Sequence, residues 1–160
     1  RILKGLADVD VTTPEGRRSV AEASKQARAL VESGPPSPGL RDALANALHT
    51  LGEGPYAVRS SMIGEDSAAH SYAGLLESHL FQRDAGDVEA ALLRCWSSAF
   101  TERALAYQAR RTTTGSAIPA VAVVVQRMID GDVSGVAFTA HPTTGRRDHC
   151  LVTATWGLGE

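Results

Sequence analysis

The sequence predicts an α+β fold with N-terminal helices and a mostly antiparallel sheet. Apolar residues recur at helical spacing through the first third of the chain, whereas β-branched runs separated by turn signals fill the last third. Another helical segment lies between two sets of predicted strands, an order typical of α+β and mixed α/β proteins. At 160 residues the chain has the length of a single domain and can bury a core.

Two helices are expected before the first strand. The first, over residues 13–32, begins with a threonine that can cap it and a proline suited to the first helical position. Gly34 is expected to end this helix as a left-handed cap. The second helix, over residues 37–51, begins with serine followed by proline, which is the same kind of signal. The predicted apolar stripe of the first helix comprises Val20, Ala23, Ala27, Leu30 and Val31.

The middle of the chain predicts a strand pair and a third helix. Residues 56–60 form the first expected strand, and residues 78–82 form its partner after a long loop. Asp87 is expected to cap a helix that continues to about Arg110, because apolar residues recur at helical spacing along this stretch.

The C-terminal part predicts a three-stranded antiparallel meander. Residues 120–125 are continuously apolar and rich in valine, which predicts a strand buried on both faces. Asp130–Gly131 is a hairpin turn signal, so residues 133–139 should return beside this strand. Residues 150–155 alternate in polarity and supply the third strand.

Composition excludes several classes of function. A net charge of −2 provides no basic surface for nucleic acid, and no apolar run approaches the ~20 residues needed to span a bilayer. Cys95 and Cys150 have no disulfide or zinc spacing, and His149 would point to the other face of a strand from Cys150. We therefore expect a reduced, cytoplasmic protein without membrane contact. Because the chain begins with Arg1 and ends after a Gly-Leu-Gly turn, we also expect it to be a piece of a longer protein.

The segment YAVRSSMIGEDSAAHSYAGLLESHL, residues 56–80, has the composition of a phosphate-binding loop. Arg59 presents a planar fork of donors, and the small and hydroxyl-bearing residues beyond it let main-chain N–H groups approach an anion. The lysine and the fixed spacing of a P-loop are absent. The alternative is an ordinary surface loop in which Arg59 pairs with Glu65 or Asp66.

Two shorter segments are further candidates. In VVVQRMIDG, the strand turns polar at Gln126 and Arg127, so main-chain groups there can meet a purine edge while Met128 packs on the ring. The alternative is a strand that simply ends in polar residues. In WGLGE, two glycines bring Glu160 to where it can hold a metal or a ribose, and the alternative is a plain turn.

Taken in order, four segments resemble the nucleotide-binding domain of the phosphoenolpyruvate synthase and pyruvate phosphate dikinase family, which rifampicin phosphotransferases and glucan water dikinases share. The resemblance covers roughly residues 38–160, and its segments are YAVRSSMIGEDSAAHSYAGLLESHL, RCWSSAFTERALAYQ, AVVVQRMIDGDVSGVAFTAHPTTG and WGLGE. It implies an ATP-grasp-like fold in which two subdomains clamp ATP. Residues 1–160 would then be part of one such domain, without its start and its C-terminal half.

The resemblance also implies roles for particular residues. Arg59 stands where the family's arginine contacts the ATP phosphates, and Gly74 to Ser78 stand in its glycine loop, with the Ser78 hydroxyl facing phosphate. Gln126, Arg127 and Met128 lie on the strand that meets adenine. No catalytic nucleophile is assigned. The lysine motif and the ligands of Mg²⁺ are expected outside this chain.

The implied reaction uses other domains of the protein. ATP is split, its phosphoryl group is transferred to a histidine on a mobile phosphohistidine domain, and an acceptor such as pyruvate is then phosphorylated on a further domain. The isolated chain is expected to be inactive. Leu75 and Leu76 replace polar residues of the family's loop, which leaves open a regulatory or scaffold module without turnover; a related dikinase acting on an antibiotic is a further alternative. An unpaired sheet edge would allow a homodimer.

Overall fold

The computed structural model describes residues 6, 9–62, 66–67, 70–71, 77–109 and 121–159. The chain divides into two compact units, Arg1–Met128 and Ile129–Glu160. The first unit contains four helices and the three-stranded sheet, and the second contains a two-stranded ribbon. The predicted α+β class is confirmed, and it agrees with a fragment of an ATP-grasp-like fold.

The two N-terminal helices begin where their capping residues predict. Helix α1 spans Pro14–Ser33 and α2 spans Pro38–Leu51, and the side chains of Thr13 and Ser37 accept hydrogen bonds from the first turns. The prediction for Gly34 is wrong, because its φ is −84° and the chain leaves α1 in an extended conformation. The stripe prediction is wrong at Leu30, which is 66% exposed because the buried face of α1 runs through Val20, Ala23 and Ala27.

The third predicted helix is interrupted. Helix α3 spans Ala85–Ser98, and α4 spans Glu102–Ala109. Asp84, not Asp87, caps α3: its side chain accepts from the Asp87 N–H, while Asp87 accepts from the Arg83 N–H. Between the helices, residues 99–101 form a turn, and Thr101 accepts a hydrogen bond from the Ala104 N–H at the start of α4.

A three-stranded antiparallel sheet forms the other layer of the first unit. Strand β1 (Tyr56–Met62) lies between β4 (Ser78–Gln82) and β5 (Val121–Arg127). The predicted pairing of 56–60 with 78–82 is confirmed. Two short strands, β2 (Asp66–Ser67) and β3 (His70–Ser71), pair with each other.

The predicted three-stranded meander is wrong. Strand β5 pairs with β1 along its whole length, whereas β6 (Val133–Phe138) pairs with β7 (Leu151–Trp156). Pairing with β1 packs Val123 and Val125 against the core, which a local hairpin with β6 would not achieve. The expectation of burial on both faces is also wrong, because Val124 is 51% exposed.

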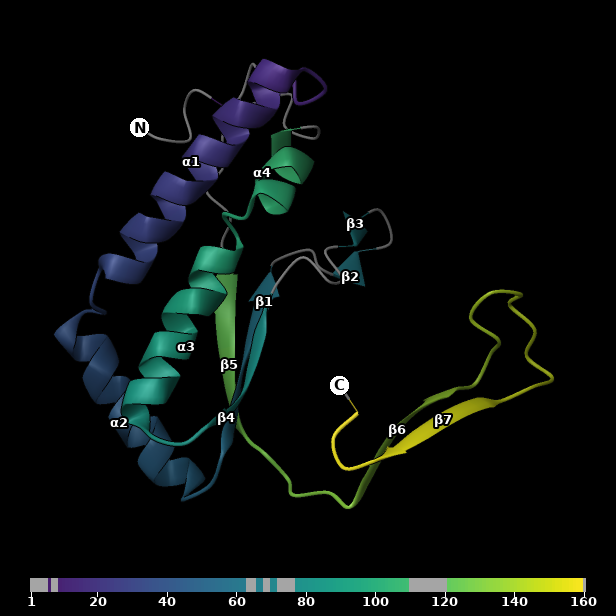
Figure 1. Cartoon of the computed structure of the whole chain (residues 1–160). Coiled ribbons are helices and arrows are strands. Elements are labelled where there is room, and N and C mark those ends of the chain that lie inside the picture. The colour runs from purple at the N-terminus through teal and green to yellow at the C-terminus, as the bar shows by residue number, and fades with distance from the viewer. Residues whose placement is uncertain are drawn as a thin grey trace. The chain divides into compact units, whose positions relative to one another are not determined.

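The helices of the first unit lie on one side of the sheet (Figure 1). Helix α3 packs directly on the strands, and α1 and α2 pack on α3. The central cluster of the core contains Leu48, Tyr56, Val58, Val88, Ala91 and Cys95. Polar contacts join the helices, with the Arg41 guanidinium on the Glu89 carboxylate at 2.7 Å and the buried Ser97 hydroxyl donating to Glu32 at 2.6 Å.

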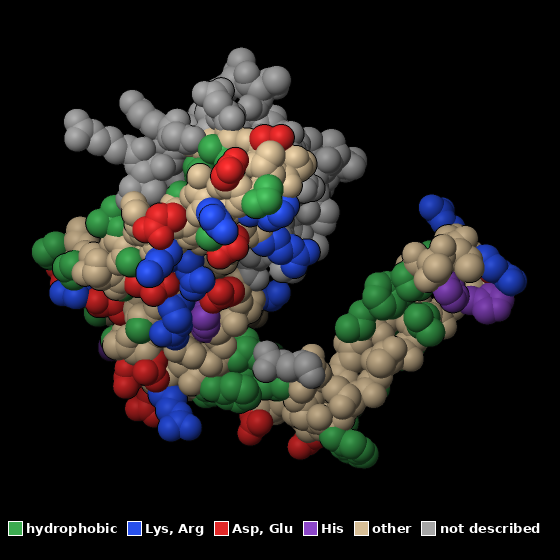
Figure 2. Space-filling model, turned by 45° about the horizontal axis from the view of Figure 1, so that its top comes forward, with side chains coloured by type: hydrophobic (Ala, Val, Ile, Leu, Met, Phe, Trp, Pro, Cys, Tyr) green, Lys and Arg blue, Asp and Glu red, His purple; other side chains and the backbone are tan. Residues whose placement is uncertain are grey.

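The second unit is an apolar ribbon with a polar tip. Hydrophobic side chains are exposed along it, and arginine and histidine gather at the tip (Figure 2), where the turn contains His141, Arg146, Arg147 and His149. The most exposed hydrophobic side chains of this unit are Trp156 at 85% and Ile129 at 82%, followed by Val152 at 65%. In the part of the chain that the structure describes, no helix is both long and apolar enough to cross a membrane.

Candidate functional site

The side chains of β1 alternate between the core face of the sheet and the opposite face, which is exposed at Arg59 although Ala57 on the same face is buried. Val58 is fully buried against α3, whereas its neighbour Arg59 is exposed on the opposite side. Residues paired directly across an antiparallel sheet share a face, so Ser78 of β4 and Val124 of β5 lie on the exposed face with Arg59. This row across the three strands forms the centre of the candidate site.

Arg59 and Ser78 are a close pair. The main-chain groups of Ser60 face β4, where the Ser60 N–H donates to the Glu77 carbonyl at 3.4 Å. Hydrogen-bonding direction alternates along a strand, so Arg59 and Ser78 occupy a non-hydrogen-bonded position, in which Cα atoms are only about 4.5 Å apart. Both side chains are exposed, so a guanidinium and a hydroxyl are presented side by side.

Gln126, Met128 and Phe81 lie toward the other end of the exposed face. Gln126 pairs with Ala57, and the Met128 N–H donates to the Pro55 carbonyl at 2.8 Å. The sulfur of Met128 accepts a hydrogen bond from the Phe81 N–H at 3.2 Å, so β4 and β5 meet across β1 here. An amide, a thioether and an aromatic ring are therefore neighbours of the Arg59 row.

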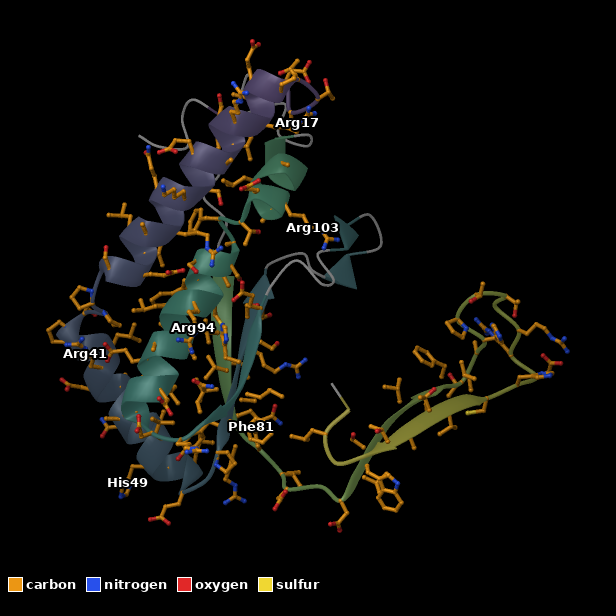
Figure 3. The ribbon with its side chains drawn as sticks, viewed as in Figure 1. Arg17, Arg41, His49, Phe81, Arg94 and Arg103 are labelled. Carbon is orange, nitrogen blue, oxygen red and sulfur yellow. The ribbon has the colours of Figure 1, made fainter. Side chains whose placement is uncertain are left out.

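Sequence reasoning missed Phe81. This residue has a φ of 56° and is 54% exposed (Figure 3 labels it). The strand register shifts between Tyr56 and Val58, so β4 has an additional residue at this point, and Phe81 lies in the resulting bulge. A left-handed aromatic residue is rare and costs on the order of 1 kcal/mol, and such strain is often found at functional sites. The five-residue sequence of β4, SHLFQ, contains no glycine or asparagine that would signal a left-handed position.

Arg127 lies on the other face of the sheet. It pairs with Tyr56, whose side chain is in the core, and not with the exposed row. The stem of Arg127 crosses the connection between α2 and β1, where a Cβ added at Gly54 would lie 3.0 Å from the arginine Cγ. The structure thus brings Gln126 and Met128 to the exposed face but separates the Arg127 side chain from Arg59.

Other residues named from the sequence lie outside the described part. These are Gly74 in the glycine loop, Glu65 as a partner for Arg59, and Glu160 at the end of the chain. The side chain of Asp66 is also not described. Within the described ranges, no three His, Cys, Asp or Glu side chains come together to hold a metal ion.

Two titratable side chains flank the strands on the core face. Burial lowers the pKa of His79, and the charge of Arg94 on α3 lowers it further while Glu77 opposes both (Figure 3 labels Arg94). The His79 Nε2 lies 3.4 Å from Glu77 Oε2 but makes no hydrogen bond there. Burial raises the pKa of the Cys95 thiol to about 11, so this thiol is protonated at neutral pH.

These features define an α+β protein that presents a guanidinium, a hydroxyl and an amide on one face of its sheet. The family model described as pyruvate phosphate dikinase, AMP/ATP-binding domain, matches residues 1–160. The chain belongs to this family. The resemblance based on the four sequence segments is confirmed.

The curated relatives have different names. A rifampicin phosphotransferase from Streptomyces sviceus is 36% identical to this chain. The match covers 97% of this chain and 18% of the relative's length. A prodigiosin synthesizing transferase from Serratia marcescens is 40% identical over 74% of the chain, which is 13% of its own length. A phosphoenolpyruvate synthase from Pyrococcus furiosus is 42% identical over 65% of the chain, again 13% of its own length. The chain thus spans between 13% and 18% of the length of these relatives.

Proposed function

We propose that this chain is the ATP-binding portion of a longer, dikinase-type phosphotransferase, and that both units belong to one ATP-grasp-like domain. Membership of an AMP/ATP-binding domain family supports ATP as the ligand. The observation that carries the site is the exposed Arg59–Ser78 pair on the free face of the sheet. A planar guanidinium beside a hydroxyl suits phosphate oxygens, because both groups donate hydrogen bonds and one carries a permanent positive charge.

In this proposal the chain positions the polyphosphate. Arg59 binds non-bridging phosphate oxygens and offsets their charge, while Ser78 donates its hydroxyl and fixes their orientation. Gly74 belongs to the loop that covers the phosphates. Mg²⁺, held by residues outside this chain, would supply additional charge neutralisation. Phosphoryl transfer depends mainly on such positioning and electrostatic stabilisation, so a chain without a nucleophile can still contribute to the rate.

The adenine base is proposed to bind beside the end of β5. The Met128 N–H faces β1, so by strand alternation the N–H and C=O of Arg127 face the outer edge of β5, which has no partner strand among the described residues. These two groups can match a donor and an acceptor on the edge of a purine. Arg127 thus contributes through its main chain, while Gln126 and Met128 contribute side chains from the exposed face.

Transfer to a histidine on another domain, and then to an acceptor, completes the proposed reaction. Pyruvate is one candidate acceptor, and an antibiotic is another, because a phosphoenolpyruvate synthase and a rifampicin phosphotransferase match this chain with similar identity. The acceptor is therefore determined by domains outside this chain. We also propose a cytoplasmic setting, which fits the two free cysteines, Cys95 and Cys150.

The test is Arg59→Ala in the intact protein, with ATP affinity and formation of phosphohistidine measured together. We expect loss of phosphohistidine and at least about tenfold weaker ATP binding, because a charged hydrogen bond is worth roughly 1.5–3 kcal/mol. Arg18 is also an exposed arginine, but it lies on α1. Arg18→Ala is therefore the matched control and should change neither measurement. Wild-type affinity and phosphorylation in Arg59→Ala would reject the site. Tight ATP binding by wild type without phosphohistidine would indicate a regulatory module.

A further inference from the structure

The main-chain carbonyl of Glu77 accepts from two elements at once. The Ser60 N–H donates to it at 3.4 Å, as an ordinary bond between β1 and β4. The Ser60 hydroxyl donates to the same oxygen at 3.0 Å, and the Cys95 thiol of α3 lies 3.6 Å from it. We call this carbonyl and its donors the Glu77 anchor. A strand pair needs only the first of these bonds, so the side chains of Ser60 and Cys95 add to the usual pairing.

The anchor surrounds the residues proposed to bind phosphate. Glu77 immediately precedes Ser78, and Ser60 immediately follows Arg59. The Cys95 thiol also lies 3.7 Å from the carbonyl of Val58, on the other side of Arg59. The main chain is therefore held on both sides of Arg59 and directly before Ser78, while both of those side chains remain free on the opposite face.

The chemistry of Cys95 suits a permanent donor. Its side chain is fully buried, and its raised pKa keeps the S–H proton at neutral pH. A protonated, buried thiol is unreactive toward oxidants and electrophiles, because the thiolate is the reactive form. Cys95 thus shares its one S–H proton between the carbonyls of Val58 and Glu77, and is not equipped to act as a nucleophile.

We propose that Ser60 and Cys95 are positioning residues, which fix Arg59 and Ser78 in register for the nucleotide phosphates through the Glu77 carbonyl. This role rests on the proposed function of the Arg59–Ser78 pair. Neither residue touches the nucleotide. Ser60 and Cys95 can therefore affect ATP binding only by changing the positions of Arg59 and Ser78. A general contribution to stability would not depend on Arg59 and Ser78 in this way.

A double-mutant cycle in the intact protein tests this requirement. ATP dissociation constants are measured by calorimetry for wild type, Ser60→Ala, Arg59→Ala and the double variant. We expect Ser60→Ala to weaken ATP about threefold to tenfold in the wild-type background and to have little further effect when Arg59 is absent, since coupled residues are not additive. Ser60→Thr keeps the hydroxyl and should restore wild-type affinity.

Hydrogen exchange provides a second readout that does not depend on nucleotide. Without ATP, the amides of residues 78–82 should exchange faster in Ser60→Ala than in wild type or Ser60→Thr, because the anchor is weakened. Ser97→Ala removes a different buried hydroxyl, on the far side of α3, and should leave both affinity and this exchange unchanged. If Ser60→Ala does not fold, Cys95→Ala carries the same expectations.

The outcomes separate the two proposals. Unchanged affinity in Ser60→Ala, with weakened affinity in Arg59→Ala, overturns the positioning role alone. An equal loss from Ser60→Ala in both backgrounds also overturns it, because the effect then does not pass through Arg59. Unchanged affinity in Arg59→Ala overturns the proposed phosphate site, and faster exchange in Ser60→Ala would then support only the anchoring of the strands.

Discussion

The indole Nε1 of Trp96 donates a hydrogen bond of 3.2 Å to the main-chain oxygen of Val121, the first residue of β5. This carbonyl faces away from β1, so strand pairing within the sheet does not satisfy it. Helix α3 thereby holds the start of the strand whose far end carries Gln126 and Met128. The contact joins residues 25 positions apart and fixes a long-range pairing that no local turn could specify.

Trp96→Phe should destabilise the first unit by about 1 kcal/mol, because it removes this one hydrogen bond while keeping most of the ring's packing. Urea unfolding followed by circular dichroism measures the change. The chain has one other tryptophan, Trp156, which is 85% exposed on the ribbon. Trp156→Phe is therefore the matched control and should leave the midpoint unchanged. Equal midpoints for both variants would contradict the role of the Trp96 contact.

Phe81 allows backbone strain to be measured directly. With a φ of 56°, glycine should fit this position better than any residue with a Cβ. We expect Phe81→Gly to be more stable than Phe81→Ala by about 1 kcal/mol, since both remove the ring and only glycine relieves the strain. Denaturant titration of the two variants gives the difference. A less stable glycine variant would show that the left-handed conformation is not strained here.

His79 should make the stability of the fold depend on pH. Its pKa is lowered in the folded protein, chiefly by burial and also by Arg94, so the unfolded chain binds a proton more readily, near the ordinary value of 6.5. The stability present above that value is therefore lost as the pH falls through 6.5 toward the folded pKa. Unfolding of wild type and His79→Gln should be compared between about pH 7.5 and about pH 5. Wild type should lose more stability than the variant, and parallel curves would contradict this.

The isolated chain should self-associate. The ribbon of β6 and β7 exposes Val152 and Trp156, and the outer edge of β5 has no partner strand in the described part. Exposed apolar strands and open edges favour pairing with another copy. We expect sedimentation velocity to show dimers or larger species at high concentration, and fewer of them in Trp156→Lys. A purely monomeric profile at high concentration would contradict this expectation.

The local elements were largely predictable from the sequence because their signals are local. Thr13 and Ser37 cap helices as their positions predict. The pairing of residues 56–60 with residues 78–82 is also predicted correctly. The sequence does not distinguish Asp84 from Asp87 as the cap of α3, because the two are three residues apart and both accept a main-chain hydrogen bond. The pairing of β5 was not predictable, because a turn signal at Asp130–Gly131 describes only neighbours in sequence.

The site was predictable in part for the same reason. Pairing of 56–60 with 78–82 brings Arg59 and Ser78 together once the register is known. The opposite orientation of the Gln126 and Arg127 side chains follows from strand alternation, which the sequence already contains. The bulge at Phe81 and the Glu77 anchor depend on tertiary contacts between β4, β1 and α3. Such contacts have no pattern in a single sequence.

A crystal structure of the intact protein with a non-hydrolysable ATP analogue tests the central claim most directly. We expect phosphate oxygens within hydrogen-bonding distance of the Arg59 guanidinium and the Ser78 hydroxyl, with the base beside Gln126 and Met128. Nucleotide density elsewhere, with Arg59 in contact only with solvent or protein carboxylates, would contradict the assignment of this sheet face as the phosphate site.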